Sequence, residues 1–138
     1  MLKILIVDDS LAIRIKMKNF VEKLGHSIIG EAKDGKEAIS KYNELQPDLV
    51  TMDISMPGLN GVDALKEIMN ISDNQANVIM ITANGQDGIV KDALLSGAKG
   101  YILKPISEEK LQDSIGKIFQ EYYVDESDIL DENDLDNL

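Results

Sequence analysis

The chain has 138 residues, of which 25 are acidic and 14 basic, so its formal net charge is −11 at neutral pH. This length suits one domain with a core of ordinary size and no second folded unit, so we expect a stand-alone domain. The acidic balance argues against binding to nucleic acid, whose phosphates would be repelled. The absence of cysteine excludes disulfides, thiolate catalysis and cysteine-based metal sites. The apolar N-terminal run ends at Asp8, too short for a signal peptide or membrane insertion, so we expect a cytoplasmic protein.

The negative charge gathers near the C-terminal end of the chain. Residues 121–138 contain eight acidic residues and neither Lys nor Arg, whereas residues 1–120 carry a net charge of −3. Because blocks of like charge usually stay solvated, we expect residues 125–138 to form a disordered acidic tail after a domain over 1–124. The alternative is a docking segment, because the tail keeps four aliphatic residues: Ile129, Leu130, Leu135 and Leu138.

Short apolar runs alternate with longer amphipathic runs through the first half of the chain. The predicted elements, in chain order, are a strand over 2–7, a helix over 10–24, a strand over 27–32 and a helix over 34–45. Gly25 ends the first helix, and Asp34 is a suitable cap for the second, which stops before Pro47. The first helix carries an apolar stripe that comprises Leu11, Ile13, Ile15, Met17, Phe20, Val21 and Leu24.

The second half repeats the alternation. The predicted elements are a strand over 49–52, a helix over 62–69, a strand over 78–81, a helix over 86–96, a strand over 101–103 and a helix that begins at Ser107. Gly97 ends the fourth helix, and Glu108 and Glu109 suit the positive end of the last one.

Five successive strand-then-helix units predict an α/β fold. The units imply a doubly wound parallel sheet with helices on both faces, connected by right-handed crossovers. For five strands the common order is 2-1-3-4-5, the flavodoxin-like (βα)5 arrangement. Ligands of such sheets bind beyond the carboxyl ends of the strands, so functional residues are expected there.

Polar residues follow four of the predicted strands. They are Asp8 and Asp9 after the first strand, Asp53 after the third, Thr82 after the fourth and Lys104-Pro105 after the fifth. Taken singly, an Asp at a strand end most often forms a turn or caps a helix. The strand order, however, places the first strand beside the third, so the three carboxylates should converge.

Three neighbouring carboxylates cannot all ionise cheaply unless a cation lies among them. Their oxygen ligands select a hard ion, and Mg²⁺ fits a few carboxylates, one carbonyl and retained waters. With Mg²⁺ and Lys104 the formal charge of the site is zero. Such a site is suited to accept a phosphoryl group.

The sequence resembles a response-regulator receiver domain of the CheY type over roughly residues 1–120. The matching segments are residues 4–10 (ILIVDDS), 47–61 (PDLVTMDISMPGLNG), 81–83 (ITA) and 97–105 (GAKGYILKP), in the order and spacing of the family. The stretch TMDISMP is most similar to chemotaxis CheY proteins. The resemblance implies two-component signalling, in which a sensor histidine kinase donates a phosphoryl group from a phosphohistidine.

The resemblance also implies roles for the residues at the strand ends. Asp53 would be the phosphoacceptor, and Lys104, whose peptide bond to Pro105 would be cis, would bind a phosphoryl oxygen. The implied Mg²⁺ ligands are Asp8, Asp9, Asp53 and the backbone carbonyl of Ser55. Catalysis would depend mainly on positioning and charge neutralisation.

The resemblance assigns a switch to Thr82 and Tyr101. The Thr82 hydroxyl would move to the phosphoryl group, and Tyr101 would turn inward, although a half-buried strand aromatic is the structural alternative for Tyr101. A partner, such as a flagellar motor switch protein, would then bind across the fourth helix, the fifth strand and the last helix. Ile106 stands where Phe is frequent in the family, and Ser55 and Asn84 occupy positions that shape the phosphoryl lifetime. No catalytic role is expected for His26, which lies in a turn.

Other functions remain as alternatives. A phosphatase of the haloacid dehalogenase type needs a second Asp two residues after the nucleophile, where this chain has Ser55. A flavodoxin-like flavin carrier needs a phosphate loop after the first strand, where Asp8 and Asp9 would repel the phosphate. Among two-component outputs, a phosphorelay intermediate or a phosphate sink is the alternative to chemotaxis. We expect a monomer or weak dimer.

Overall fold

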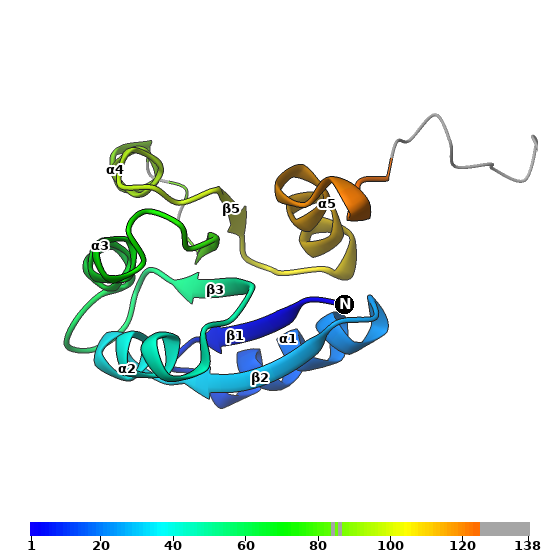
Figure 1. The fold of residues 1–138 in the computed structure, drawn as a ribbon, viewed down its shortest axis with the longest axis horizontal. Coiled ribbons are helices and arrows are strands. Elements are labelled where there is room, and N and C mark those ends of the chain that lie inside the picture. Colours follow the sequence, from blue (N-terminus) through cyan, green and yellow to red (C-terminus); the bar gives the residue numbers. More distant parts are fainter. Residues whose placement is uncertain (84, 86, 125–138) are drawn as a thin grey trace, which may run out of the picture.

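The computed structural model describes residues 1–83, 85 and 87–124, so the acidic tail predicted over 125–138 lies outside the described residues. Five strands and five helices alternate along this part of the chain, and a short 3-10 helix follows them (Figure 1). Their bounds are β1 (Lys3–Val7), α1 (Leu11–Lys23), β2 (Ser27–Ala32), α2 (Gly35–Leu45), β3 (Leu49–Asp53), α3 (Gly61–Ile71), β4 (Val78–Thr82), α4 (Asp87–Leu95), β5 (Gly100–Leu103), α5 (Glu108–Ile118) and η1 (Gln120–Tyr122).

The strands form one parallel sheet in the order β2-β1-β3-β4-β5, which confirms the predicted flavodoxin-like α/β fold. Figure 1 shows α2, α3 and α4 on one face of the sheet and α1 and α5 on the other. In the register, Val7 lies beside Met52, and Asp53 lies beside Ile81. The carboxyl ends of β1, β3 and β4 therefore meet at one edge of the sheet.

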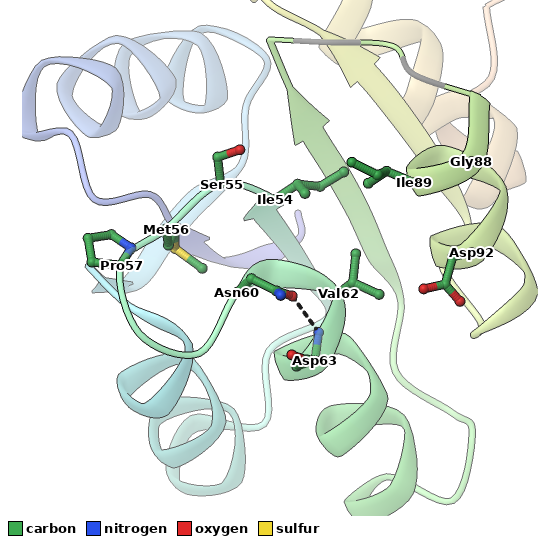
Figure 2. Close-up of a pocket in the computed structure, with 10 residues that line it drawn as sticks. All are labelled: Ile54, Ser55, Met56, Pro57, Asn60, Val62, Asp63, Gly88, Ile89 and Asp92. Carbon is green, nitrogen blue, oxygen red and sulfur yellow. Dashed lines mark hydrogen bonds between the residues drawn. The ribbon is translucent and has the colours of Figure 1, made fainter.

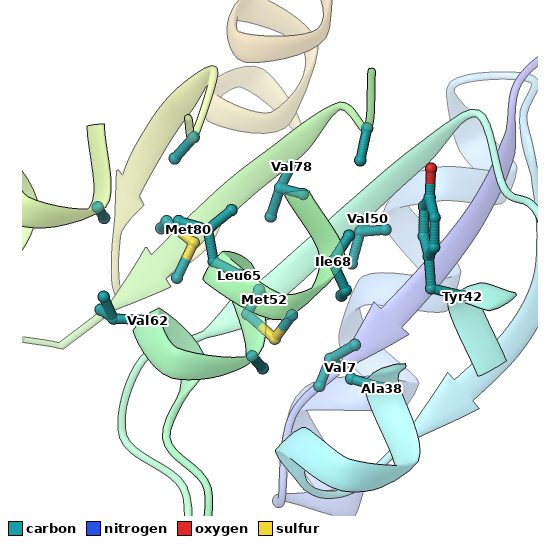
Figure 3. Close-up of a cluster of buried hydrophobic side chains, with 14 of the residues drawn as sticks. Val7, Ala38, Tyr42, Val50, Met52, Val62, Leu65, Ile68, Val78 and Met80 are labelled. Atoms are coloured by element: carbon teal, nitrogen blue, oxygen red, sulfur yellow. The ribbon is translucent and has the colours of Figure 1, made fainter. Parts of the chain in front are cut away.

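The alternation of side chains along the central strands creates two apolar layers. Val7, Val50 and Met80 point to the layer under α2, α3 and α4 (Figure 3). Ile6 and Ile79 point to the layer under α1 and α5. Because β1, β3 and β4 are almost fully buried on both faces, their sequences read as continuous apolar runs.

Side-chain caps start four of the helices. The Asp34 carboxylate accepts a 2.8 Å hydrogen bond from the Glu37 N–H, as predicted. The corresponding caps of α1, α3 and α5 are Ser10, Asn60 and Ser107. Gly25 and Gly97, just after α1 and α4, have φ of +87° and +113°, which suits glycine at helix ends. Each described helix is too short or too polar to cross a bilayer.

The apolar stripe predicted on the first helix is wrong at two positions. Met17 and Val21 are buried, whereas Leu11 and Ile15 are exposed by 61% and 54%. Seven apolar residues over 14 positions occupy more than one face of a helix, and Leu11 and Ile15 lie four residues apart on the solvent side. The predicted element boundaries otherwise differ from the observed ones by at most two residues, as is usual at element ends.

Candidate functional site

The three carboxylates predicted to converge do so at the carboxyl edge of the sheet. Asp8 and Asp9 follow β1, and Asp53 is the last residue of β3. One carboxylate oxygen of each lies within 4.8 Å of the others. Asp8 and Asp53 are buried and Asp9 is exposed, so the cluster is open to solvent on one side.

Lys104, which follows β5, brings a positive charge to this cluster. Its Nζ lies 3.3 Å from Asp8 Oδ2 and 3.4 Å from Asp53 Oδ1, and its peptide bond to Pro105 is cis, as expected. One ammonium group therefore faces three carboxylates. The excess negative charge and the all-oxygen donor set fit a hard divalent cation.

The protonation of the cluster reflects both burial and charge. Burial, and after it the charge of Asp8, raise the pKa of Asp53 from 3.8 to about 6, while Lys104 opposes both. Burial by itself would lower the pKa of Lys104, but Asp53 and Asp8 outweigh it and raise that pKa. Near neutral pH, Asp53 is therefore mostly ionised and Lys104 is charged.

Two further residues hold the cluster in place, and sequence reasoning missed both. Arg14 Nη1 donates to the Asp8 carbonyl at 2.8 Å, and its Nε pairs with Glu31 at 3.1 Å. A Cβ on Gly61 would lie 2.1 Å from the carbonyl oxygen of Asp53, so α3 can start against the end of β3 only with glycine there. An Asn-Gly pair such as residues 60–61 is typical of a loop, but no local sequence signal indicates this close approach.

The other predicted site residues lie at the end of β4, in the loop after β3 and on β5. Thr82 ends β4 and is buried, and its carbonyl accepts a 2.8 Å hydrogen bond from the Lys104 N–H. Ser55 lies in the loop after β3 with its side chain exposed. Tyr101 lies on β5. Its side chain is 47% exposed and lines a surface hollow next to α4. Asn84 lies outside the described residues.

His26 and Ile106 take part in packing. His26 precedes β2 at the opposite edge of the sheet, where its Nδ1 accepts a hydrogen bond from the Leu2 N–H at 3.0 Å. His26 therefore lies away from the carboxyl ends of the strands, as expected from its place in the sequence. Ile106 is buried in the layer under α1 and α5.

A hollow of about 620 Å³ lies next to Ile54 and Ser55, the two residues that follow Asp53 (Figure 2). Its walls come from the loop after β3, the start of α3 and the start of α4, and include Ser55, Met56, Asn60 and Ile89. In Figure 2 the Asn60 side chain accepts a hydrogen bond from the Asp63 N–H, at 2.9 Å. The sequence did not identify Met56 and Ile89 as lining residues, because nothing in its hydrophobic pattern shows that the loop after β3 lies beside the start of α4.

Comparisons with known proteins agree with this geometry. Residues 4–116 match the family described as the response regulator receiver domain. The chain is 45% identical to the chemotaxis protein CheY of Thermotoga maritima over 116 residues, which cover 84% of this chain and 96% of that protein. It is 46% identical to the chemotaxis protein CheY of Bacillus subtilis over 115 residues, covering 83% of this chain and 95% of that protein.

A solved structure of a CheY protein also matches the chain in fold and sequence. The structure described as the CheX-CheY-BeF3-Mg+2 complex from Borrelia burgdorferi matches with a TM-score of 0.82 and 39% identity, covering 85% of this chain and 88% of that chain. Fold, carboxylate cluster and sequence agree. The chain therefore belongs to the response regulator receiver family, is similar to chemotaxis CheY proteins, and is a phosphorylation-regulated switch and not an enzyme in the ordinary sense.

Proposed function

We propose that the chain is a stand-alone response regulator that accepts a phosphoryl group on Asp53 from the phosphohistidine of a sensor histidine kinase. The Asp53 carboxylate carries the proposal: it is 3% exposed, lies 3.4 Å from Lys104 Nζ and clusters with two further carboxylates. An Asp53 oxygen would form a bond to phosphorus while the phosphorus–nitrogen bond breaks. The electron pair would leave on the imidazole nitrogen, which is then protonated.

Asp8, Asp9 and Asp53, with the backbone carbonyl of Ser55, would hold the Mg²⁺ that this reaction needs. Bound Mg²⁺ would supply positive charge against the phosphoryl oxygens. Lys104, whose ammonium already lies between Asp8 and Asp53, would bind one phosphoryl oxygen. Catalysis would then consist of positioning and charge neutralisation, the two effects that dominate phosphoryl transfer.

Thr82 and Tyr101 would convert phosphorylation into a change of surface. The Thr82 hydroxyl would hydrogen-bond the phosphoryl group, and Tyr101 would move inward from the exposed position it has here. A hollow of about 420 Å³ beside Tyr101, lined by Val90 and Leu94 among others, offers room for the ring to move. Phosphorylation would thus shift the population between two packings of one fold.

The receiver unit would extend over 1–124, with the acidic segment 125–138 outside it. A protein partner, in chemotaxis a flagellar motor switch protein, would bind across α4, β5 and α5. The likeness to chemotaxis CheY proteins at about 45% identity supports a chemotaxis role. We propose a cytoplasmic location, with neither nucleic acid nor membrane as a partner.

Labelling by acetyl phosphate with Mg²⁺ tests the chemistry. The wild-type chain should incorporate one phosphoryl group, and Asp53→Asn should incorporate none. Asp113→Asn removes an exposed carboxylate from α5 and should label as the wild type does. Stoichiometric labelling of Asp53→Asn would place the acceptor elsewhere.

Binding of fluoroberyllate, a phosphoryl mimic, tests the metal and the output. Binding should need Mg²⁺, and metal-independent binding would contradict the carboxylate cage. A pull-down should retain a flagellar motor switch protein only with fluoroberyllate present. Retention of a histidine phosphotransfer protein in its place would favour the phosphorelay alternative.

A further inference from the structure

Four large apolar side chains are exposed together on α4 and β5. Leu94, Leu95, Tyr101 and Leu103 are exposed by 42%, 79%, 47% and 42%. A monomeric domain usually scatters such side chains, and a contiguous patch marks a binding site. We call this surface the α4–β5 face.

The α4–β5 face is hollowed on both sides of Tyr101. A hollow of about 420 Å³ lies between Tyr101 and the α4 residues Leu94 and Leu95. A second, of about 250 Å³, lies between β5 and α5 and includes Leu103. Because Tyr101 lines both, the two hollows form one groove across β5, the last strand of the sheet.

Basic residues border the groove. Lys91 lines the first hollow, and Lys110 and Lys117 line the second, against a single carboxylate, Asp113. Lys110 Nζ donates to the carbonyls of Leu103 and Pro105, which neutralises none of its charge. Within the part of the chain that the structure describes, neither Lys91 nor Lys117 forms an ion pair. The groove therefore suits an acidic segment that also carries aliphatic side chains.

Residues 125–138 of this chain have that composition. They contain seven acidic residues, no Lys or Arg, and four aliphatic residues. We infer that residues 125–138 dock in the groove of the α4–β5 face in the same molecule. The aliphatic side chains enter the two hollows beside Tyr101, and the carboxylates lie near Lys91 and Lys117.

The path of the chain after α5 makes this docking geometrically easy. Gln112 Nε2 donates to the Tyr122 carbonyl at 2.7 Å, and a Cβ on Gly116 would lie 3.1 Å from Tyr123 Cα. The chain thus turns back against the face of α5 that carries Gln112 and Gly116. The tail has only to cross one helix, about 10–12 Å wide. Fourteen residues span up to about 46–50 Å when extended, more than enough.

A second copy of the chain is a poorer occupant of the groove. Two copies would bring the same excess of Lys together, whereas the tail brings opposite charge at a high effective concentration. The docked tail covers the face that we propose for the output partner, and it would lower that partner's affinity. This consequence rests on the proposed function, but the docking does not, since it requires no phosphoryl group.

The absence of cysteine in the chain allows a direct test. A nitroxide spin label is attached to Asn133→Cys in the full ¹⁵N-labelled chain, and backbone amide signals are compared before and after reduction of the nitroxide. Docking predicts at least a twofold loss of intensity for Leu94, Leu95 and Tyr101 at low salt. Loss confined to the end of α5 and η1 would overturn the inference.

Charge reversal supplies the matched controls. Lys91→Glu with Lys117→Glu should remove the intensity loss on the α4–β5 face, and Lys36→Glu, at an exposed position on α2, should preserve it. Mixing spin-labelled ¹⁴N chain with unlabelled ¹⁵N chain should give no loss, and a loss there would show that the tail binds a second copy. Because acetyl phosphate labelling is measured separately, a failure of docking and a failure of phosphoryl acceptance are distinguishable.

Discussion

At the scale of single residues, the site places a carboxylate where burial opposes its ionisation. Asp53 is 3% exposed beside Asp8, and one ammonium, that of Lys104, serves both. The raised pKa of Asp53 shows that Lys104 does not compensate fully for burial and repulsion. The ionised carboxylate therefore destabilises the fold.

Asp53→Asn should consequently stabilise the metal-free protein. The folded-state pKa of Asp53 is raised from 3.8 to about 6, so its contribution to stability is complete below pH 3.8 and is lost as the pH rises through 6. At pH 7.5, with a chelator present, the variant should gain about 1–3 kcal/mol in free energy of unfolding. Urea unfolding at pH 7.5 and pH 4 measures this gain, which should shrink at pH 4. Equal stability of the two proteins at pH 7.5 would contradict the electrostatic account.

His26 should give the opposite dependence on pH. Burial lowers its pKa, the N-terminal ammonium lowers it further, and Glu121 partly opposes them. The neutral ring therefore stabilises the fold above the ordinary pKa of 6.5, and this stability is lost as the pH falls through the lowered folded-state value. Between pH 7.5 and pH 5, wild type should lose more stability than His26→Gln in thermal unfolding. Equal losses of stability in the two proteins would mean that His26 has the same pKa in the folded and unfolded states.

At the scale of elements, the functional side chains depend on how helices begin at the carboxyl edge of the sheet. The Ser10 N–H donates to the Asp8 carboxylate at 2.8 Å, and the Ser10 hydroxyl caps α1. Gly61 starts α3 directly against the carbonyl of Asp53. The helix starts therefore fix the backbone that carries the carboxylates.

Gly61→Ala should disturb that arrangement. Its Cβ would lie 2.1 Å from the Asp53 carbonyl oxygen, so β3 or α3 must shift. We expect a loss of about 1–3 kcal/mol in free energy of unfolding, together with slower labelling by acetyl phosphate. Gly88→Ala, in α4 with no atom within 4 Å of the added Cβ, is the control and should be neutral or slightly stabilising. An unchanged stability and labelling rate for Gly61→Ala would show that the backbone there relaxes freely.

The elements themselves were largely predictable from the sequence. The caps of α1, α2 and α5 stand beside apolar runs of the right period, so local chemistry marks them. The exposure of Leu11 and Ile15 was not predictable in the same way. A sequence shows that a residue is apolar, but which side of a crowded helix meets the sheet depends on the packing of α1 against it.

At the scale of the whole molecule, two apolar layers share one sheet. Leu65 of α3 is fully buried in one layer and Leu111 of α5 in the other. The strands between them supply side chains to both layers. We therefore expect the layers to unfold together in one cooperative transition.

Leu65→Ala and Leu111→Ala test this cooperativity. Each should cost about 2–5 kcal/mol in free energy of unfolding, because each leaves a cavity in a fully buried layer. Urea unfolding followed by far-ultraviolet circular dichroism and by tyrosine fluorescence should give coincident transitions in both variants. Two separate transitions in either variant would show that the layers unfold independently.

The sequence by itself determined the class of fold and the chemistry of the site. Alternating apolar runs specify strand-then-helix units, and Asp8, Asp9, Asp53 and Lys104 follow strands whose carboxyl ends share one edge in any such sheet. Only the tertiary structure decided the distances of 3.3 and 3.4 Å around Lys104, the support from Arg14 and Gly61, and the basic groove beside Tyr101. The physical reason is that periodicity is a local property of the chain, whereas these contacts join residues from elements far apart in sequence, whose distances depend on how the helices pack on the sheet.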